Sequence, residues 1–311
     1  MSAANSLDAQ IRPITGRRRI IAAVCVLAML AMLYWWGWGT GIEVAIRDLV
    51  ADSGANTSGT VTLAGQMRRL AGNLLFTAVA AVAFCTVRRL ACGFAFIRPA
   101  KAVESASPVG GPVSGPTSAL RRWWDAGFAY CFCMLAGFAA IDVASAVLGT
   151  TFHSYPFGTR YESAWAATIY LINMFFAGPT EELVLLGLAV IGLRWVGAPW
   201  WLVGTVAVCL RVPFHLYYGW AAFAIAVWPV LAVLLFRRVG MITPMIVAHG
   251  MYDVSTSMTS LTVVFGSNWP LVVSGLIVAT PVVWLVATIV VRIRDRRGRA
   301  RAARKGNARR A

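Results

Sequence analysis

Ionisable side chains recur inside stretches of this sequence that are otherwise apolar. They are Asp142, Glu181, Glu182, Arg211, His215, His249 and Asp253. The chain has three histidines, and two of them belong to this set. An ionisable group inside a lipid bilayer costs about 2.5 to 3.5 kcal/mol on insertion scales, so these residues indicate a functional site.

Six of these residues form three clusters on successive apolar segments. The clusters are Glu181 with Glu182, Arg211 with His215, and His249 with Asp253. The members of the second and third clusters are four residues apart, so within a helix each pair shares one face. The glutamates follow Gly178-Pro179, where we expect a new helix whose first turn favours negative charge.

Histidines and carboxylates buried together can activate a water molecule, either directly as a general base or through a bound metal ion. A rise of about 1.5 Å per residue places all three clusters at one depth, in the middle to outer half of the bilayer. Buried histidine and aspartate also form proton or ion relays, so a transporter is the alternative class. Inverted repeats would favour transport, and we find none in the sequence.

The elements that must position these clusters are membrane helices. Of the 311 residues, 59% are hydrophobic and 13% are charged. An ordinary soluble protein carries about 25% charged residues. This composition excludes a soluble enzyme, a disordered protein and a fibrous protein. Because the alternation typical of membrane strands is absent, we expect an all-α polytopic membrane protein.

Eight apolar runs are long enough to cross a bilayer, and we expect about eight transmembrane helices. The runs cover 20–37, 70–87, 127–148, 163–194, 199–218, 220–236, 241–259 and 271–291. The fourth run is too long for one straight span. Gly178-Pro179 predicts a break or kink within it.

These runs divide the chain into four parts. We expect a signal anchor and a second transmembrane helix in 1–97, a flexible cytoplasmic linker in 98–122, a six-helix membrane core in 123–291 and a basic tail in 292–311. The tail is expected to be disordered and to contact anionic lipids.

The net charge of +16 has a topological explanation. With the N-terminus in the cytoplasm, 23 of the 28 basic residues fall in cytoplasmic segments and four fall outside. This distribution predicts a multi-pass protein of a bacterial-type plasma (inner) membrane with both termini in the cytoplasm. A nucleic-acid partner is not expected.

Three ordered motifs resemble the CPBP family, the CAAX-processing and bacteriocin-processing (Abi) intramembrane proteases. The family motifs are E-E-x-x-x-R, F-x-x-x-H and H-x-x-x-N/D. The corresponding runs begin at Glu181, end at His215 and extend from His249 to Asp253. The resemblance covers 163–259 and implies an intramembrane endopeptidase that acts on membrane or membrane-associated substrates.

The resemblance also implies roles for these residues. Glu181, helped by His215, would deprotonate a water that attacks a peptide carbonyl. His249 and Asp253 would stabilise the developing oxyanion or orient one another. The family has also been described with a divalent metal such as zinc, for which Glu181, His215 and His249 are the candidate ligands.

Two positions depart from the family motifs. Leu186 stands where the first motif has arginine, and Arg211 stands where the second has phenylalanine. We expect Arg211 to pair with Glu182 or Asp142 in place of the missing arginine, so that Glu182 and Arg211 support the site. A pseudoprotease that binds membrane partners without cleaving them is the second alternative.

Overall fold

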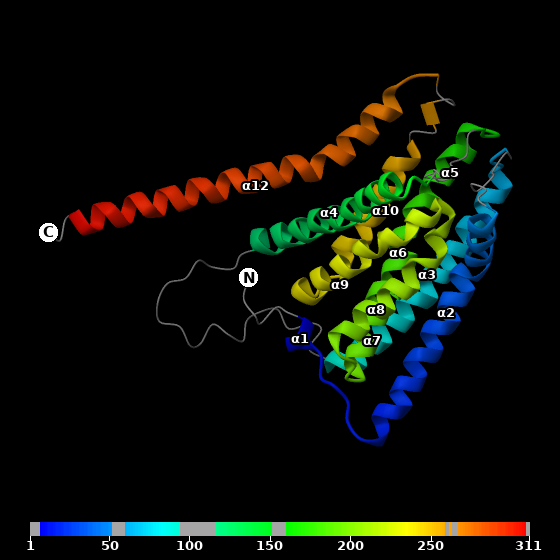
Figure 1. Ribbon diagram of the computed structural model, residues 1–311, viewed down its shortest axis with the longest axis horizontal. Helices are drawn as coiled ribbons and strands as arrows, with labels where there is room; N and C mark the ends of the chain where they lie inside the picture. Colours follow the sequence, from blue (N-terminus) through cyan, green and yellow to red (C-terminus); the bar gives the residue numbers. More distant parts are fainter. Residues whose placement is uncertain are drawn as a thin grey trace.

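The computed structural model describes residues 7–51, 60–93, 116–150, 160–258, 261–262 and 266–308. Helices make up nearly all of this part (Figure 1), and its β-structure is one isolated bridge between Val61 and Tyr161. Six helical segments within it are long and apolar enough to cross a membrane. They are Arg17–Val50, Leu63–Cys92, Ala119–Leu148, Ala164–Trp195, Trp220–Val239 and Trp269–Val290. The expected all-α polytopic membrane protein is therefore confirmed.

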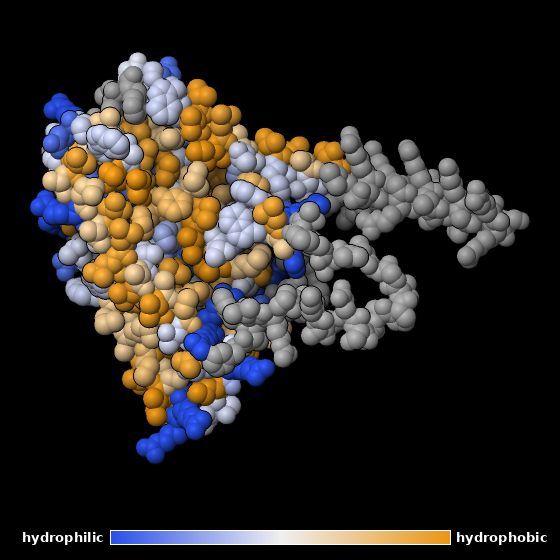
Figure 2. All heavy atoms as spheres, turned by 180° about the vertical axis from the view of Figure 1, so that it is seen from behind, coloured by the Kyte–Doolittle hydropathy of each residue, from blue (hydrophilic) through white to orange (hydrophobic). Residues whose placement is uncertain are grey.

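The first two apolar runs are long, regular helices at one side of the bundle (Figure 1). They are α2 (Arg17–Val50) and α3 (Leu63–Cys92), and a short helix, α1 (Leu7–Gln10), precedes them. Figure 2 shows apolar side chains over most of one face of the bundle, with hydrophilic residues mainly towards its ends. Such a surface fits a lipid environment, because a soluble monomer rarely exposes an apolar patch of this extent.

The fourth apolar run is divided as the sequence predicted. α5 (Ala164–Phe175) ends one residue before α6 (Ala177–Glu181), which continues into a π-helix, η3 (Glu182–Leu188), and then α7 (Ala189–Trp195). Glu181 lies one turn later in its helix than we expected. The reason is that Pro179 is the third residue of α6, where its missing N–H breaks no helical hydrogen bond, so the helix begins before it.

The fifth apolar run is not one membrane-spanning helix, which corrects the prediction for 199–218. α8 (Trp200–Arg211) ends before Pro213 and is followed by two 3-10 helices, η4 (Pro213–Tyr218) and η5 (Trp220–Ala226). Pro213 explains this end, because it has no backbone N–H to donate to the carbonyl of the residue four positions earlier. The seventh run forms α10 (Thr243–Met258), a helix of 16 residues. The count of eight spans is therefore not confirmed.

The remaining long helices close the bundle. α4 (Pro116–Leu148) packs against α9 (Val227–Val239) and α10, while α12 (Trp269–Ala308) packs on α10 and diverges from the bundle towards the C-terminus (Figure 1). α4 begins six residues before the linker was expected to end, and residues 98–115 of that linker lie outside the described residues. The tail predicted to be disordered is helical to Ala308.

The N-terminal segment joins several chain segments at one end of the bundle. The backbone N–H of Arg12 donates to the carbonyl of Ala91 over 2.9 Å. Asp8 accepts from Arg237 at 2.9 Å and from Arg194 at 3.4 Å. Arg12, Arg194 and Arg237, which the charge distribution assigned to one side of the membrane, therefore meet at one end of the bundle.

The segments assigned to the other side also meet. The backbone N–H of Val61 donates to the carbonyl of Arg160 over 2.8 Å, and the N–H of Glu162 donates to the carbonyl of Val61 over 3.0 Å. These contacts join the segment before α3 to the segment before α5, far from the end that holds Asp8. The relative placement agrees with the predicted sidedness, while the orientation in the membrane stays a prediction.

We expect reporters fused after residues 110, 238 and 311 to report the cytoplasm, because 23 of the 28 basic residues then lie on that side. Paired phosphatase and fluorescent-protein fusions measure this directly, with a fusion after residue 160 as the control on the opposite side. A periplasmic signal at residue 238 would contradict the assignment.

Candidate active site

Glu182 is the centre of a buried ionic cluster. Its Oε1 accepts a hydrogen bond from Arg211 Nη2 at 2.8 Å and another from His249 Nδ1 at 2.7 Å. The side chain of Glu182 is fully buried and that of Arg211 is 2% exposed. The pairing of Arg211 with Glu182 is one of the two that we expected, and the pairing with Asp142, whose side chain is exposed on α4, is wrong.

Two glycines bring the glutamates and His249 together. A Cβ atom at Gly178 would collide with the carbonyl oxygen of Ile246, and one at Gly250 would lie 2.6 Å from the carbonyl oxygen of Phe175. The backbone of α10 therefore lies directly against the α5–α6 junction, an approach that only small residues permit in membrane helices. Because Gly250 follows His249, this contact sets the imidazole beside the glutamate turn.

The local backbone separates the two glutamates. Glu181 is the last residue of α6 and Glu182 is the first residue of the π-helix η3. Single π-turns within α-helices occur frequently at functional sites, since they change the direction of neighbouring side chains. Here Glu182 is fully buried, while the Glu181 side chain is 13% exposed.

Tyr130 and Trp228 enclose the buried side of the cluster. The Tyr130 hydroxyl accepts from Arg211 Nη1 at 3.3 Å and from Trp228 Nε1 at 3.1 Å. The Arg211 guanidinium lies 4.1 Å from the Trp228 ring centroid. The sequence did not identify either residue. A buried tyrosine or tryptophan needs a polar partner, but the sequence does not show which of its aromatic residues are buried beside the arginine.

The opposite side of the cluster is more open. His249 Nε2 lies 3.9 Å from Glu181 Oε2 and 3.7 Å from Asp253 Oδ2, and the Asp253 side chain is 29% exposed. Among the described residues, Glu181 Oε2 has no hydrogen-bond partner. These separations are too long for direct hydrogen bonds, and a water between the groups could bond to them. Glu182 Oε2 is likewise buried without a partner among the described residues, and Glu181 Oε2 is the oxygen that faces His249 Nε2.

His215 lies on η4 rather than on α8. Its Nδ1 is 2.8 Å from the carbonyl oxygen of Arg211, which can only accept, so Nδ1 carries a hydrogen. In the neutral ring, Nε2 is then the free basic nitrogen. The Trp228 ring packs edge-on against both imidazoles, with centroids 5.9 Å from His215 and 5.1 Å from His249. The structure therefore brings all three predicted clusters to one site.

Only part of the described cluster suits a metal ion. Glu181, Glu182 and His249 offer ligand atoms within 4.8 Å of one another. However, Glu182 Oε1 already accepts from Arg211 and from His249. The guanidinium also places a positive charge where a dication would bind. His215, expected as a ligand, does not belong to this group.

The loss of Arg211 contacts can be probed without removing a charge. We expect Tyr130→Phe to destabilise the protein by about 1 to 3 kcal/mol, because two buried donors lose their acceptor. Thermal unfolding in detergent measures this change. Tyr34→Phe is the control, since the buried hydroxyl of Tyr34 has no partner among the described residues. Equal stability of the two variants would contradict this role for Tyr130.

The comparisons with known proteins agree with the geometry. Residues 163–255 match the family model described as Type II CAAX prenyl endopeptidase Rce1-like. This match confirms the resemblance to CAAX-processing intramembrane proteases over nearly the same residues. It includes every residue of the cluster except Tyr130, which α4 contributes from outside the matched range. No curated protein and no solved structure matches this chain.

Proposed function

We propose that this protein is an intramembrane endopeptidase of the CAAX-protease type that hydrolyses peptide bonds of membrane or membrane-associated substrates. The observation that carries the proposal is the position of Glu181, whose free Oε2 faces His249 Nε2 on the more open side of a buried ionic cluster. The family match over residues 163–255 supports the same reaction class.

In the proposed mechanism, Glu181 accepts a proton from a water molecule, which attacks the peptide carbonyl. The free Nε2 of His215 assists this transfer, as the tautomer fixed by the Arg211 carbonyl allows. Glu181 then returns this proton to the leaving amine as the C–N bond breaks. His249 Nε2 and Asp253 face the same space. Because Nδ1 of His249 donates to Glu182, Nε2 would donate to the developing oxyanion in the protonated, imidazolium form of the ring. Asp253 donates to this oxygen only when it is protonated; otherwise it orients His249.

Glu182 has a different proposed task. Its Oε1 holds the Nδ1–H of His249, so that the second nitrogen of the ring faces Glu181 and Asp253. Arg211 fixes Glu182 directly through its hydrogen bond to Oε1. Tyr130 acts indirectly, because its hydroxyl accepts from the Arg211 guanidinium. A preorganised donor loses no orientation energy when charge develops in the transition state. Glu182 and Arg211 therefore support the reaction without touching the substrate.

The convergence of the ionisable groups bears on the transport alternative. A proton or ion relay would place them along a path across the membrane. Here Glu181, Glu182, Arg211, His249 and Asp253 are linked by contacts of 2.7 to 3.9 Å within one cluster. One compact site with an unpartnered carboxylate oxygen supports hydrolysis.

Zinc bound at the same residues is the alternative proposal for how water is activated. Glu181, Glu182 and His249, whose ligand atoms lie within 4.8 Å of one another, would hold the ion, and zinc would supply a Lewis acid for the carbonyl. Glu182 Oε1 already accepts hydrogen bonds from Arg211 and His249. We therefore expect purified protein to contain no stoichiometric zinc and to retain activity with 1,10-phenanthroline. Metal analysis of the parent and of Glu181→Gln measures this. One zinc per chain, lost in the variant, would establish the metal mechanism instead.

The substrate is to be found by comparing native termini. Cells that carry the parent protein or Glu181→Gln are compared by quantitative proteomics of the N- and C-termini of membrane-associated proteins. We expect a set of new termini in the parent that disappears in the variant. If both cells give the same termini although both proteins are present in the membrane, the proposed endopeptidase activity is wrong.

A further inference from the structure

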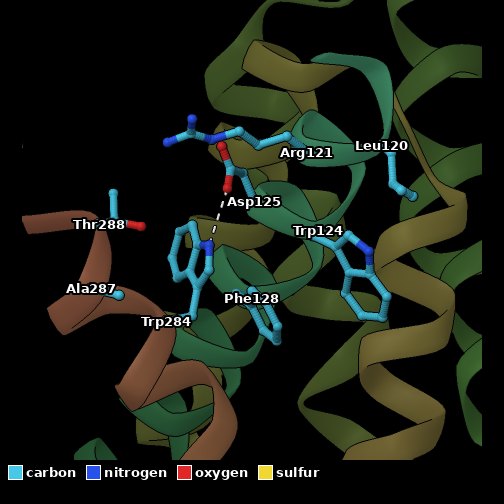
Figure 3. A pocket seen from close by; sticks show the side chains of 8 residues that line it. All are labelled: Leu120, Arg121, Trp124, Asp125, Phe128, Trp284, Ala287 and Thr288. Atoms are coloured by element: carbon cyan, nitrogen blue, oxygen red, sulfur yellow. Dashed lines mark hydrogen bonds between the residues drawn. The ribbon is translucent and has the colours of Figure 1, made fainter. Parts of the chain in front are cut away.

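A cleft lies between α4 and α12, separate from the residues of the candidate active site. It has a volume of about 470 Å³, and its lining residues include Arg121, Trp124, Asp125, Phe128 and Trp284. We call it the α4–α12 cleft. Figure 3 shows the side chains from α4 facing those from α12, with Trp284 reaching from α12 towards Asp125.

The wall of the α4–α12 cleft is aromatic. Trp124 and Phe128 stack with ring centroids 5.6 Å apart, and Phe128 lies 5.2 Å from Trp284. The Trp284 Nε1–H donates to Asp125 Oδ1 at 3.1 Å, so the polar edge of the indole is satisfied within the protein. The wall thus presents ring faces to its occupant, and Trp124 is 47% exposed.

The cleft lies at the basic end of the bundle. On α4 it uses the first turns after Pro116, and on α12 it uses the last apolar turns before residues 292–311, which hold ten basic residues. Exposed tryptophans at the end of an apolar span are typical of the level where lipid headgroups meet acyl chains. The predicted topology places this end in the cytoplasmic leaflet, which carries the anionic lipids.

One cation at the cleft is available for an anion. Arg121 is exposed and forms no ion pair with the described residues, unlike Arg194, Arg211 and Arg237. In Figure 3 its side chain passes the Asp125 carboxylate, and its guanidinium ends on the side of Trp284. Asp125 bonds to the indole. The cleft therefore combines a guanidinium at one end with an apolar wall beneath it.

We propose that the α4–α12 cleft binds one anionic phospholipid from the surrounding leaflet. Its acyl chain lies against Trp124, Phe128 and Trp284, and its phosphate contacts Arg121, with the neighbouring Arg122 adding positive charge. The lipid fills the space between α4 and the diverging α12 and joins the last helix to the bundle. The proposal does not depend on the proposed protease activity, because the cleft shares no residue with that site.

The test compares retention of two lipids with the same acyl chains, dimyristoyl phosphatidylglycerol and dimyristoyl phosphatidylcholine. The full chain is purified from equimolar mixed micelles, and native mass spectrometry counts the retained lipids. We expect one phosphatidylglycerol per chain and little phosphatidylcholine. Arg121→Gln should lower phosphatidylglycerol retention about fivefold, because one basic residue near an anionic lipid surface contributes about that factor.

Two further variants separate the parts of the site. Trp124→Ala should lower retention of both lipids, since it removes part of the apolar wall. Arg68 is an exposed arginine near the start of α3 and does not line the cleft. Arg68→Gln should therefore retain as much of each lipid as the parent and serves as the control. Equal retention of both lipids by the parent, or equal phosphatidylglycerol retention by Arg121→Gln and Arg68→Gln, would overturn the proposal. Dimers that assemble through the cleft and exclude lipid would overturn it as well.

Discussion

Glu181→Gln is expected to lower the rate of peptide hydrolysis by about 10² to 10⁴-fold, the usual contribution of a positioned general base. The amide keeps the size of the side chain and removes its ability to take a proton. Because Glu181 Oε2 has no hydrogen-bond partner among the described residues, we expect thermal stability to change little. Initial rates with a peptide taken from the comparison of native termini measure the effect.

Two variants control for the position of the change. His215→Ala should reduce the rate by a similar factor, since Nε2 of His215 is the proposed assistant base. Glu182→Gln should reduce the rate less but should lower stability more, because Glu182 Oε1 accepts from both Arg211 and His249. If Glu182→Gln is the inactive, stable variant and Glu181→Gln is active, the roles of the two glutamates are reversed.

Arg211→Leu is expected to destabilise the protein by about 3 to 5 kcal/mol, because removing one partner of a buried ion pair leaves an uncompensated charge. The pair with Glu182 is 2.8 Å long, and both side chains are almost fully buried. Activity should fall as well, since Glu182 also holds His249. Thermal unfolding in detergent and the cleavage assay measure the two effects together.

The matched control is Arg237→Leu. Arg237 pairs with Asp8 at 2.9 Å, but both side chains are more than one third exposed. Exposed pairs contribute about 0 to 1 kcal/mol, so this variant should be close to the parent. If both arginine variants have the stability of the parent, the buried pair does not hold the site in place.

The double variant Arg211→Leu with Leu186→Arg tests whether Arg211 replaces the family arginine. Leu186 is buried in η3, four residues after Glu182. An arginine there approaches the same carboxylate from its own helix, and we expect it to recover part of the stability and activity lost in Arg211→Leu. No recovery would show that the position of the cation, and not only its charge, determines the site.

The sequence was sufficient to predict the main helices and the meeting of the clusters. Both follow from strong physical signals, since apolar runs are forced into helices by the bilayer and buried charges need partners. Gly178-Pro179 also predicted the break before the glutamates. Because the apolar segments contain few charged residues, the sequence offered Glu182 and Asp142 as partners for Arg211. The structure shows that the partner is Glu182, which is buried, whereas Asp142 is exposed.

Other features depended on tertiary contacts. Hydropathy does not distinguish an α-helix from the 3-10 helices that carry His215 and the residues after it, although Pro213 was a signal for the end of α8. The π-helix at Glu182 has no residue signature. Tyr130 was not identified because it lies outside the three motifs, and only the packing of α4 on α9 and α10 brings its hydroxyl to Arg211.

Hydrolysis in H₂¹⁸O by the purified protein tests the central claim most directly. The substrate is a peptide whose new termini depended on Glu181 in cells, and mass spectrometry follows its products. The account predicts one ¹⁸O atom in the new carboxyl terminus with the parent protein and no product above background with Glu181→Gln. Labelled product formed at the same rate by both proteins would show that Glu181 is not the base, and unlabelled or absent product with the parent would contradict the protease assignment itself.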